Sequence, residues 1–461
     1  MRTLHPFHRL WTAAAVSNLG DGVTMVAGPL LLATVSDSPA LIAGGAFAGQ
    51  LPWLLFSLFS GAFVDRLDRR RLVVVVNLLR GGVLTGLAVV IASGHVSVPL
   101  IYLAAFLLGV GETLADTAYG ALLPAVVAPD DLERANARLA ATFTIANQFV
   151  AKPFGAWLYG IAAAVPFGLD AATFVAAAAL IAGLPRIHAA GAAPALPALP
   201  PTEPQAAKAH PADSTPAAAK AHLADSTPAA AKAHLADSTP GGSSPGSERA
   251  DLRSTLRSEI TEGLRWLWRH RLLRALAAAM GVANIAFCAA FAVFVLYARE
   301  RLALSDVGYG FLLTTFAVGG LAGAGLAIRL AQRFGTATIL RAGLIVEVIT
   351  HLTLAVTTSP LTAGGVIVIF GVHTMIWGVL VAGIRQRTVP DHLRGRVGSV
   401  FGLLETGGAA LGWLLGAVLT QFWSVTTPFW IAAFAMLAVT AAAWRPISLS
   451  QPLTRTPPPR P

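Results

Sequence analysis

Charged residues and cysteine are scarce in this chain of 461 residues: Asp, Glu, Lys and Arg together make up 12% of it, and Cys288 is its single cysteine. One cysteine excludes an intrachain disulfide and a redox-active pair. The 11 histidines are scattered, and the sequence has no metal-ligand spacing, nucleophile elbow or phosphate-cradling loop. It therefore predicts no enzyme, no metal site and no bound cofactor, and it disfavours a membrane enzyme or a sensor.

Long apolar runs dominate the chain instead. Hydrophobic residues make up 55% of it, and a run of ~20 such residues matches the ~30 Å hydrocarbon core of a bilayer when it coils as a helix. Twelve runs of this kind occur, at about 10–34, 40–63, 73–93, 99–127, 140–163, 167–186, 273–297, 307–330, 338–357, 362–384, 397–420 and 426–444. The expected fold class is an all-α membrane protein with twelve transmembrane helices in the lipid bilayer.

The arginines predict the orientation of these helices. The formal net charge is +10, but the arginines gather in alternate loops, after the second, fourth, eighth and tenth runs, so no nucleic-acid partner is expected. Short loops rich in Lys and Arg stay in the cytoplasm, which predicts two cytoplasmic termini; Arg299 and Arg301 are an exception on the outer side. Arg2 and Arg9 flank the first run without a cleavage site, so we expect no removable signal peptide. The richness in Ala, Pro and Arg is typical of GC-rich bacteria, which predicts the bacterial cytoplasmic (inner) membrane.

Residues 187–248 interrupt the apolar pattern. Three copies of a twelve-residue unit, such as "AAAKAHLADSTP", follow one another over 205–240. The copies carry almost no bulky apolar side chain, so they cannot offset the entropy of ordering. We expect a disordered cytoplasmic linker here, rather than a metal site built from its repeated histidines, and a disordered tail at 445–461.

The segment 249–272 has a helical pattern. Its apolar stripe consists of Leu252, Leu256, Ile260, Leu264 and Leu267. Trp266, Trp268 and six arginines accompany this stripe. Such a pattern predicts an amphipathic helix on the inner membrane surface; a soluble helix packed on a neighbour is the alternative.

The two apolar halves look duplicated. The stretches "PDDLERANARLA" and "PDHLRGRVGSVF" begin 261 positions apart, at Pro129 and Pro390, and "GAFVDRLDRR" has a weaker echo, "GLAIRLAQRF", displaced by 264 positions. Nearly equal displacements indicate two parallel six-helix repeats, at 1–186 and 273–444. Repeats of this kind occur in transporters that rock one half against the other.

Four stretches carry a family resemblance: "GAFVDRLDRRR", "LLPAVVAPDDLERANA", "EGLRWLWRHRLLRAL" and "VPDHLRGRVGSVF". They resemble the major facilitator superfamily, in the branch of siderophore exporters, macrolide-type efflux proteins and "secretion effector" transporters. The resemblance covers the chain except residues 187–248 and the tail.

The resemblance implies a cytoplasmic latch between the halves, formed by the loop after the second helix. The expected latch residues are Gly61, Asp65, Arg69 and Arg70, with Arg80 near the rim as a further member. Contacts made in only one of two states bias the equilibrium between them. The alternative is that these arginines serve only as a topology signal.

Ionisable residues inside spanning helices are costly and usually functional. Asp21, Glu112 and Lys152 lie near the expected midplane, and Asp116 follows Glu112 by four positions on the same helix face. The family places helices 1, 4, 7 and 10 around the central cavity. The expected substrate cavity therefore comprises Asp21, Glu112, Lys152, Asn284 and His373.

Proton coupling is expected at Asp21, Glu112 and Asp116, because a low dielectric disfavours the ionised carboxylate. Lys152 departs from the family, whose antiporters often have glycine before this proline. It either pairs with Asp21 or Glu112 or attracts an anionic part of the substrate. An acid paired with Lys152 would stay ionised and the other would titrate, and Asp21 is the one expected to titrate.

Four other residues receive weaker expectations. Glu347 and His351 are expected to form a structural pair on one helix. Glu405 is expected either to pair with nearby arginines or to carry a proton. Asp170 is expected to reach interfacial water, where it needs no function.

The sequence and the resemblance thus predict a secondary active transporter that exports a small organic molecule (drug, siderophore or natural product) by proton antiport with alternating access. The proton gradient takes the place of a cofactor, and a monomer is expected. The alternative is a proton-coupled or facilitative importer of a small metabolite.

Overall fold

The computed structural model describes residues 6–64, 67–128, 131–184, 261–390 and 393–448. Within these ranges every regular element is a helix, so the predicted all-α fold class is confirmed. The predicted linker, residues 249–260 of the predicted amphipathic helix, and residues 449–461 lie outside the described part of the chain.

The N-terminal half begins with four long helices. These are α1 (Pro6–Val35), α2 (Pro39–Val64), α3 (Arg69–Ala92) and α4 (Val98–Val126). A continuous rod follows, made of α5 (Leu132–Phe143), the π-helix η2 (Thr144–Ala151) and α6 (Lys152–Ile161), and α7 (Val165–Ala182) completes the half. The wider π-helical turn ends next to Pro153, whose ring removes one N–H from the helical hydrogen-bond ladder.

The C-terminal half repeats this arrangement. Its elements are α9 (Arg271–Ala292), α10 (Phe294–Leu296) with the π-helical η4 (Tyr297–Arg301), α11 (Asp306–Phe334), α12 (Thr336–Val356), α13 (Pro360–Thr388), α14 (Arg394–Phe422) and α15 (Thr427–Ile447). Eleven helices of the described residues are long and apolar enough to cross a membrane. The rod α5–η2–α6 occupies the place of the predicted fifth crossing.

Glycines bring helices into backbone contact inside the C-terminal half. A Cβ at Gly319 of α11 would lie 2.0 Å from the carbonyl oxygen of Val368 on α13. A Cβ at Gly416 of α14 would lie 2.3 Å from the carbonyl oxygen of Ala289 on α9. Small residues permit this close packing in membranes, where apolar attraction between helices is weak.

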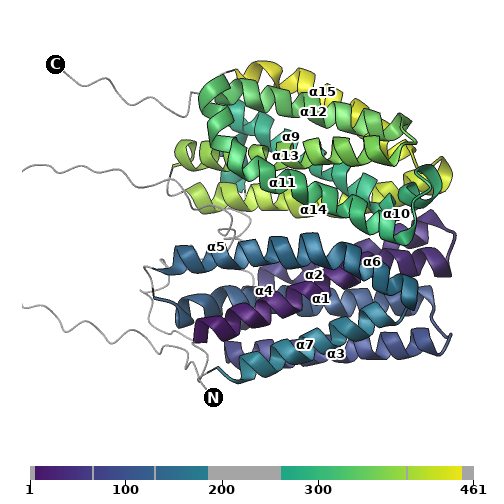
Figure 1. Ribbon diagram of the computed structural model, residues 1–461. Coiled ribbons are helices and arrows are strands. Elements are labelled where there is room, and N and C mark those ends of the chain that lie inside the picture. Colours follow the sequence, from purple (N-terminus) through teal and green to yellow (C-terminus); the bar gives the residue numbers. More distant parts are fainter. Residues whose placement is uncertain (1–5, 65–66, 129–130, 185–260, 391–392, 449–461) are drawn as a thin grey trace, which may run out of the picture.

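The two halves lie side by side as two bundles, and α1 starts at the same end at which α15 stops (Figure 1). We call this the terminal end. At the opposite end, one buried cluster contains residues of both halves, among them Leu30, Phe167, Tyr297 and Phe429. There the Ser38 hydroxyl also donates to Gln421 Oε1 over 2.9 Å.

Toward the terminal end the buried core divides in two. One cluster, with Leu10 and Ile181, belongs to the N-terminal half, and another, with Leu273 and Val397, belongs to the C-terminal half. The halves therefore share a core at the opposite end and have separate cores at the terminal end.

Candidate functional site

A buried ion pair lies midway along the N-terminal half. Arg80 Nη2 of α3 lies 2.8 Å from Asp21 Oδ1 of α1, and the two side chains are 7% and 29% exposed. The guanidinium lies over the Phe174 ring, 4.1 Å from its centroid. On α4, Gly111 leaves room for the arginine stem, because a Cβ there would lie 2.7 Å from Arg80 Cγ.

This position corrects one expectation and leaves another open. Arg80 lies eleven positions beyond Arg69, the first residue of α3, and pairs with Asp21. Its placement near the rim is therefore wrong, whereas its part in the latch stays a prediction. The sequence signal was present, since an arginine inside an apolar run is functional by default.

Two further carboxylates lie on α4 near this pair. Glu112 and Asp116, one helical turn apart, are both exposed, whereas the neighbouring Gly111, Thr113 and Ala115 are buried. The Arg80 charge acts electrostatically on both acids and on Asp21 and Asp170. The charge of one cation thus acts electrostatically on four carboxyl groups.

Asp170 of α7 is the fourth of these acids. It is 1% exposed and accepts hydrogen bonds from Thr24 Oγ1, at 2.6 Å, and from Thr173 Oγ1, at 3.1 Å. A Cβ at Gly20 would lie 2.1 Å from Asp170 Oδ1, so α1 approaches the carboxyl group closely. The expectation that Asp170 reaches interfacial water is wrong, because α1 covers it.

Further buried polar groups lie on α3 and α4 of this half. Among the described residues, Arg80 Nε is buried without a hydrogen-bond partner, and the buried Tyr119 hydroxyl interacts with the Asn77 side chain. Buried polar groups are usually paired with protein or water.

Lys152 lies apart from the acids. It is 4% exposed, and its ammonium donates to Gln148 Oε1 one turn earlier. No ion pair joins it to Asp21 or Glu112 in the described part of the chain. Its backbone faces α11, where a Cβ at Gly310 would lie 2.8 Å from the Lys152 carbonyl oxygen. The cation that pairs with Asp21 is therefore Arg80, and not Lys152 as one interpretation of the sequence proposed.

In the C-terminal half, His373 of α13 faces Glu347 of α12, with 2.9 Å between Nε2 and Oε2. These side chains are 10% and 5% exposed. His351 Nδ1 donates to the backbone oxygen of Glu347 over 2.9 Å, so the expected Glu347–His351 side-chain pair is replaced by a pair between helices. Nothing in the spacing of positions 347 and 373 signals this contact.

Asn284 of α9 donates through Nδ2 to the backbone oxygen of Glu405 on α14. The Glu405 side chain is exposed. The two expected cavity residues of this half, Asn284 and His373, are thus both engaged with neighbouring helices.

The predicted latch is described only in part. Gly61 lies in the last turn of α2, and Asp65 lies outside the described residues. Arg69 Nη1 donates to the Ala121 oxygen of α4 over 3.4 Å, and Arg70 Nη2 donates to the Ala182 oxygen at the end of α7. Cations at helix C-termini are favourable, and both contacts lie within the N-terminal half.

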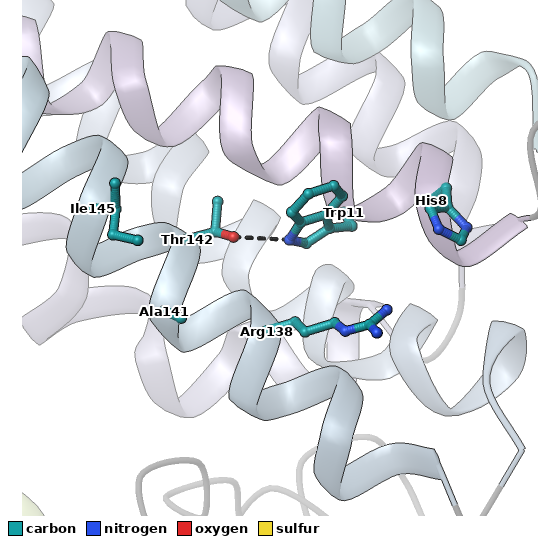
Figure 2. Close-up of a pocket in the computed structure, with 6 residues that line it drawn as sticks. All are labelled: His8, Trp11, Arg138, Ala141, Thr142 and Ile145. Carbon is teal, nitrogen blue, oxygen red and sulfur yellow. Dashed lines mark hydrogen bonds between the residues drawn. The ribbon is translucent and has the colours of Figure 1, made fainter.

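A pocket of about 410 Å³ opens between α1 and α5 at the terminal end (Figure 2). Its lining consists of His8, Trp11, Arg138, Ala141, Thr142 and Ile145. The Trp11 indole N–H donates to Thr142 Oγ1 over 2.8 Å. The described residues contain no cluster of three or more His, Cys, Asp or Glu side chains suited to a metal ion.

Two helical halves with charges buried between their helices are typical of a membrane transporter. Comparison with known proteins defines the class. A family model described as "Transmembrane secretion effector" matches residues 3–197, and one described as "Major Facilitator Superfamily" matches residues 275–461. The chain belongs to the major facilitator superfamily.

Individual relatives agree with this assignment. The multidrug efflux pump Tap of Mycolicibacterium fortuitum is 25% identical over 445 residues, which cover 94% of this chain and 93% of the relative. An uncharacterized MFS-type transporter of Mycobacterium tuberculosis is 35% identical over 130 residues, 28% of this chain and 29% of the relative. The chain is thus a multi-pass membrane transporter and not an enzyme.

Solved structures share the fold. A bacterial homologue of the iron transporter ferroportin in its inward-facing state has a TM-score of 0.67 at 15% identity, covering 97% of this chain and 100% of that one. The same homologue in its outward-facing state has a TM-score of 0.55 at 17% identity, covering 96% and 100%. The nucleoside transporter NupG has a TM-score of 0.64 at 10% identity, covering 97% and 100%.

Proposed function

We propose that this transporter exports a small organic molecule, such as a drug, siderophore or natural product, by proton antiport across a bacterial cytoplasmic membrane. The observation that carries the proposal is a cluster of acids around one cation: among the described residues, Arg80 pairs with Asp21, and its charge also acts on Glu112, Asp116 and Asp170. One cation does not neutralise four carboxylates inside a membrane-spanning half, which supports proton binding there. The likeness to a multidrug efflux pump over nearly the whole chain supports export.

We assign different roles to the acids because only one of them contacts Arg80 in the described part of the chain. Asp21 lies 2.8 Å from Arg80, a contact that favours its ionised form. Glu112 and Asp116 have no such contact among the described ion pairs and are exposed on α4. We therefore assign the exchangeable proton to Glu112, with Asp116 in support, and the fixed negative charge to Asp21. As expected from the sequence, one acid stays ionised beside a cation and another titrates. The proposal differs in that the cation is Arg80 instead of Lys152 and the titrating acid is Glu112 instead of Asp21.

In the proposed cycle, the proton enters while the opposite end is open and the terminal end is closed. After the halves rock, Glu112 releases this proton to the cytoplasm. Its carboxylate is then ionised, and the site binds the substrate. Substrate leaves when the opposite end opens again and the next proton binds. One site thus serves both ligands in turn, which couples their opposite movements.

The proposed orientation places the terminal end in the cytoplasm, following the arginine-rich loops. Arg69, Arg70, Arg394 and Arg396 all lie at the starts of helices that enter from this end. With this orientation, the arrangement described above is open to the cytoplasm. The pocket beside Trp11 then lies where a cytoplasmic molecule meets the N-terminal half.

The test uses inside-out vesicles with an imposed proton gradient and a panel of radiolabelled drugs and siderophores. We expect uphill accumulation that collapses with the gradient. Glu112→Gln should abolish uphill accumulation yet keep exchange without a gradient, whereas Glu133→Gln, at an exposed acid in the first turn of α5, should change neither. Accumulation only in right-side-out vesicles would establish the importer. Normal pH-dependent accumulation by Glu112→Gln and Asp21→Asn would move coupling to His373 or Glu405.

A further inference from the structure

One cationic and aromatic surface takes no part in the proposed transport cycle. Residues 261–269 form a helix at the terminal end, directly before α9, and we call it the interfacial helix. Gly263 and Leu267, one turn apart, are its buried residues. A Cβ at Gly263 would lie 2.7 Å from the backbone oxygen of Arg396, so this face is pressed against α14. Glu262 also pairs with Arg396.

The faces turned away from α14 carry two other stripes. Leu264 and Trp268, one turn apart, are 47% and 66% exposed. Arg265 and Arg269, again one turn apart, are exposed on the next stripe around the helix. At 100° per residue the apolar stripe lies between the buried face and the arginine stripe.

The end of the interfacial helix is held in a defined shape. His270 stacks on Trp266, with 5.5 Å between ring centroids, and its Nδ1 accepts the Leu273 N–H that begins α9. Arg274 Nη1 donates to the Trp268 backbone oxygen over 2.8 Å, and its guanidinium lies 5.4 Å from the indole centroid. Trp268 is therefore oriented although it is exposed.

The described residues provide no counter-charge for the arginines of this surface. Arg265, Arg269 and Arg271 are exposed, and no ion pair in the described part of the chain joins them to a carboxylate. Glu262, the acid of the interfacial helix in that part, is engaged by Arg396. Three cations therefore stand beside an exposed tryptophan and leucine at the end of a membrane-spanning helix.

We propose that this surface is a binding site for the headgroup of an anionic phospholipid, with Trp268 and Leu264 in the upper acyl region and Arg265, Arg269 and Arg271 around the phosphate. Tryptophan prefers the membrane–water interface, where its ring is apolar and its N–H stays hydrated. Arginines on an amphipathic helix attract anionic lipids, and each contributes about a fivefold preference. A protein partner would not explain why the apolar stripe continues from the face that packs on the transmembrane bundle.

The experiment measures lipid next to Trp268 in the full-length protein. The Trp268 signal is the fluorescence difference between the wild-type protein and Trp268→Phe in phosphatidylcholine bilayers that contain a rising fraction of brominated lipid. Brominated phosphatidylglycerol should quench this signal at a mole fraction at least tenfold lower than brominated phosphatidylcholine. The triple variant R265Q/R269Q/R271Q should lose that preference and keep quenching by both lipids.

The matched control is R329Q/R333Q, which removes exposed arginines from the terminal end of α11. It should keep the preference for phosphatidylglycerol. Equal quenching by both lipids in the wild-type protein would overturn the proposal, as would equal loss of preference in the control, which would indicate a general surface charge. Absence of quenching by either lipid would place Trp268 outside the bilayer and also overturn it. Each variant is first checked for a wild-type thermal transition in detergent.

Discussion

Arg80 is enclosed by its ion-pair partner, an aromatic ring and the backbone of α4, so its charge depends on that partner for compensation. Asp21 supplies the nearest negative charge at 2.8 Å, and Phe174 supplies the ring face. Breaking a buried ion pair leaves an uncompensated charge, which costs more than the pair contributes. The first prediction follows from this asymmetry.

Asp21→Asn should lower the free energy of unfolding by about 3 kcal/mol, because Arg80 is then buried without a full counter-charge. The double variant Asp21→Asn/Arg80→Gln should recover most of this loss. Thermal unfolding in detergent, followed by tryptophan fluorescence, compares the three proteins. Equal stability of the single and double variants would mean that another acid compensates Arg80.

The limits of sequence analysis are clearest at these same residues. Asp21, Glu112 and Asp116 could be selected because a carboxylate inside an apolar run is conspicuous. Their partners could not, because Asp21 meets a residue 59 positions away and Glu347 meets one 26 positions away. Depth along a helix follows from counting residues, whereas the direction of a side chain around it depends on packing with neighbours.

At the scale of single elements, the crossing of α6 and α11 holds the two halves together at the opposite end. Gly310 of α11 lies against Lys152, Pro153 and Ala156 of α6, and a Cβ would lie 2.8 Å from the Lys152 carbonyl oxygen. Backbone atoms cannot yield as a flexible side chain does. This contact exists only while the opposite end is closed in the proposed cycle.

Gly310→Val should therefore disfavour the described arrangement and enrich the state that is open at the opposite end. A cysteine introduced at Thr314, one turn further along α11, should react faster with a membrane-impermeant maleimide from the opposite side. Gly325→Val on the same helix is the control, because nothing lies within 4 Å of a Cβ there. An unchanged labelling rate in Gly310→Val would contradict the assigned closure.

The elements themselves were largely predictable, because twelve apolar runs of membrane-spanning length are a strong signal. The interruption of the fifth run was not predicted: only the packing reveals that η2 widens into a π-helix before Pro153. The amphipathic pattern of 249–272 predicted a membrane-surface helix, and within its described part residues 261–269 are helical. Contact with α14 through Gly263 had no signature in the sequence.

The latch connects elements to the whole molecule. Asp65→Asn should slow transport while substrate affinity in detergent stays within about twofold, because the residue comes directly after α2 in the sequence and α2 stops at the terminal end. Its carboxylate is expected to bias the exchange between states and not to contact substrate. Transport rates in proteoliposomes and equilibrium binding separate these effects. An equal loss of affinity would assign Asp65 to the substrate site.

At the scale of the whole molecule, residues 205–240 should be dispensable. Their repeated Ala, Pro and polar composition offers no face to bury, so deletion changes only the reach of the linker. Export by the deletion variant should stay within about twofold of the wild-type protein at equal membrane abundance. Lost export at normal abundance would make the repeats a binding element.

The glycine contacts that pack α11 against α13 and α9 against α14 also make the C-terminal half a rigid body. Since backbone touches backbone there, little compression is available, and displacement concentrates at the boundary with the other half. In the proposed cycle the shared core is the fulcrum only while the opposite end stays closed, and α14 with its 29 residues gives an arm of about 40 Å. A rotation of about 10° about this fulcrum moves the far end by about 7 Å, which is the width of an aromatic ring system.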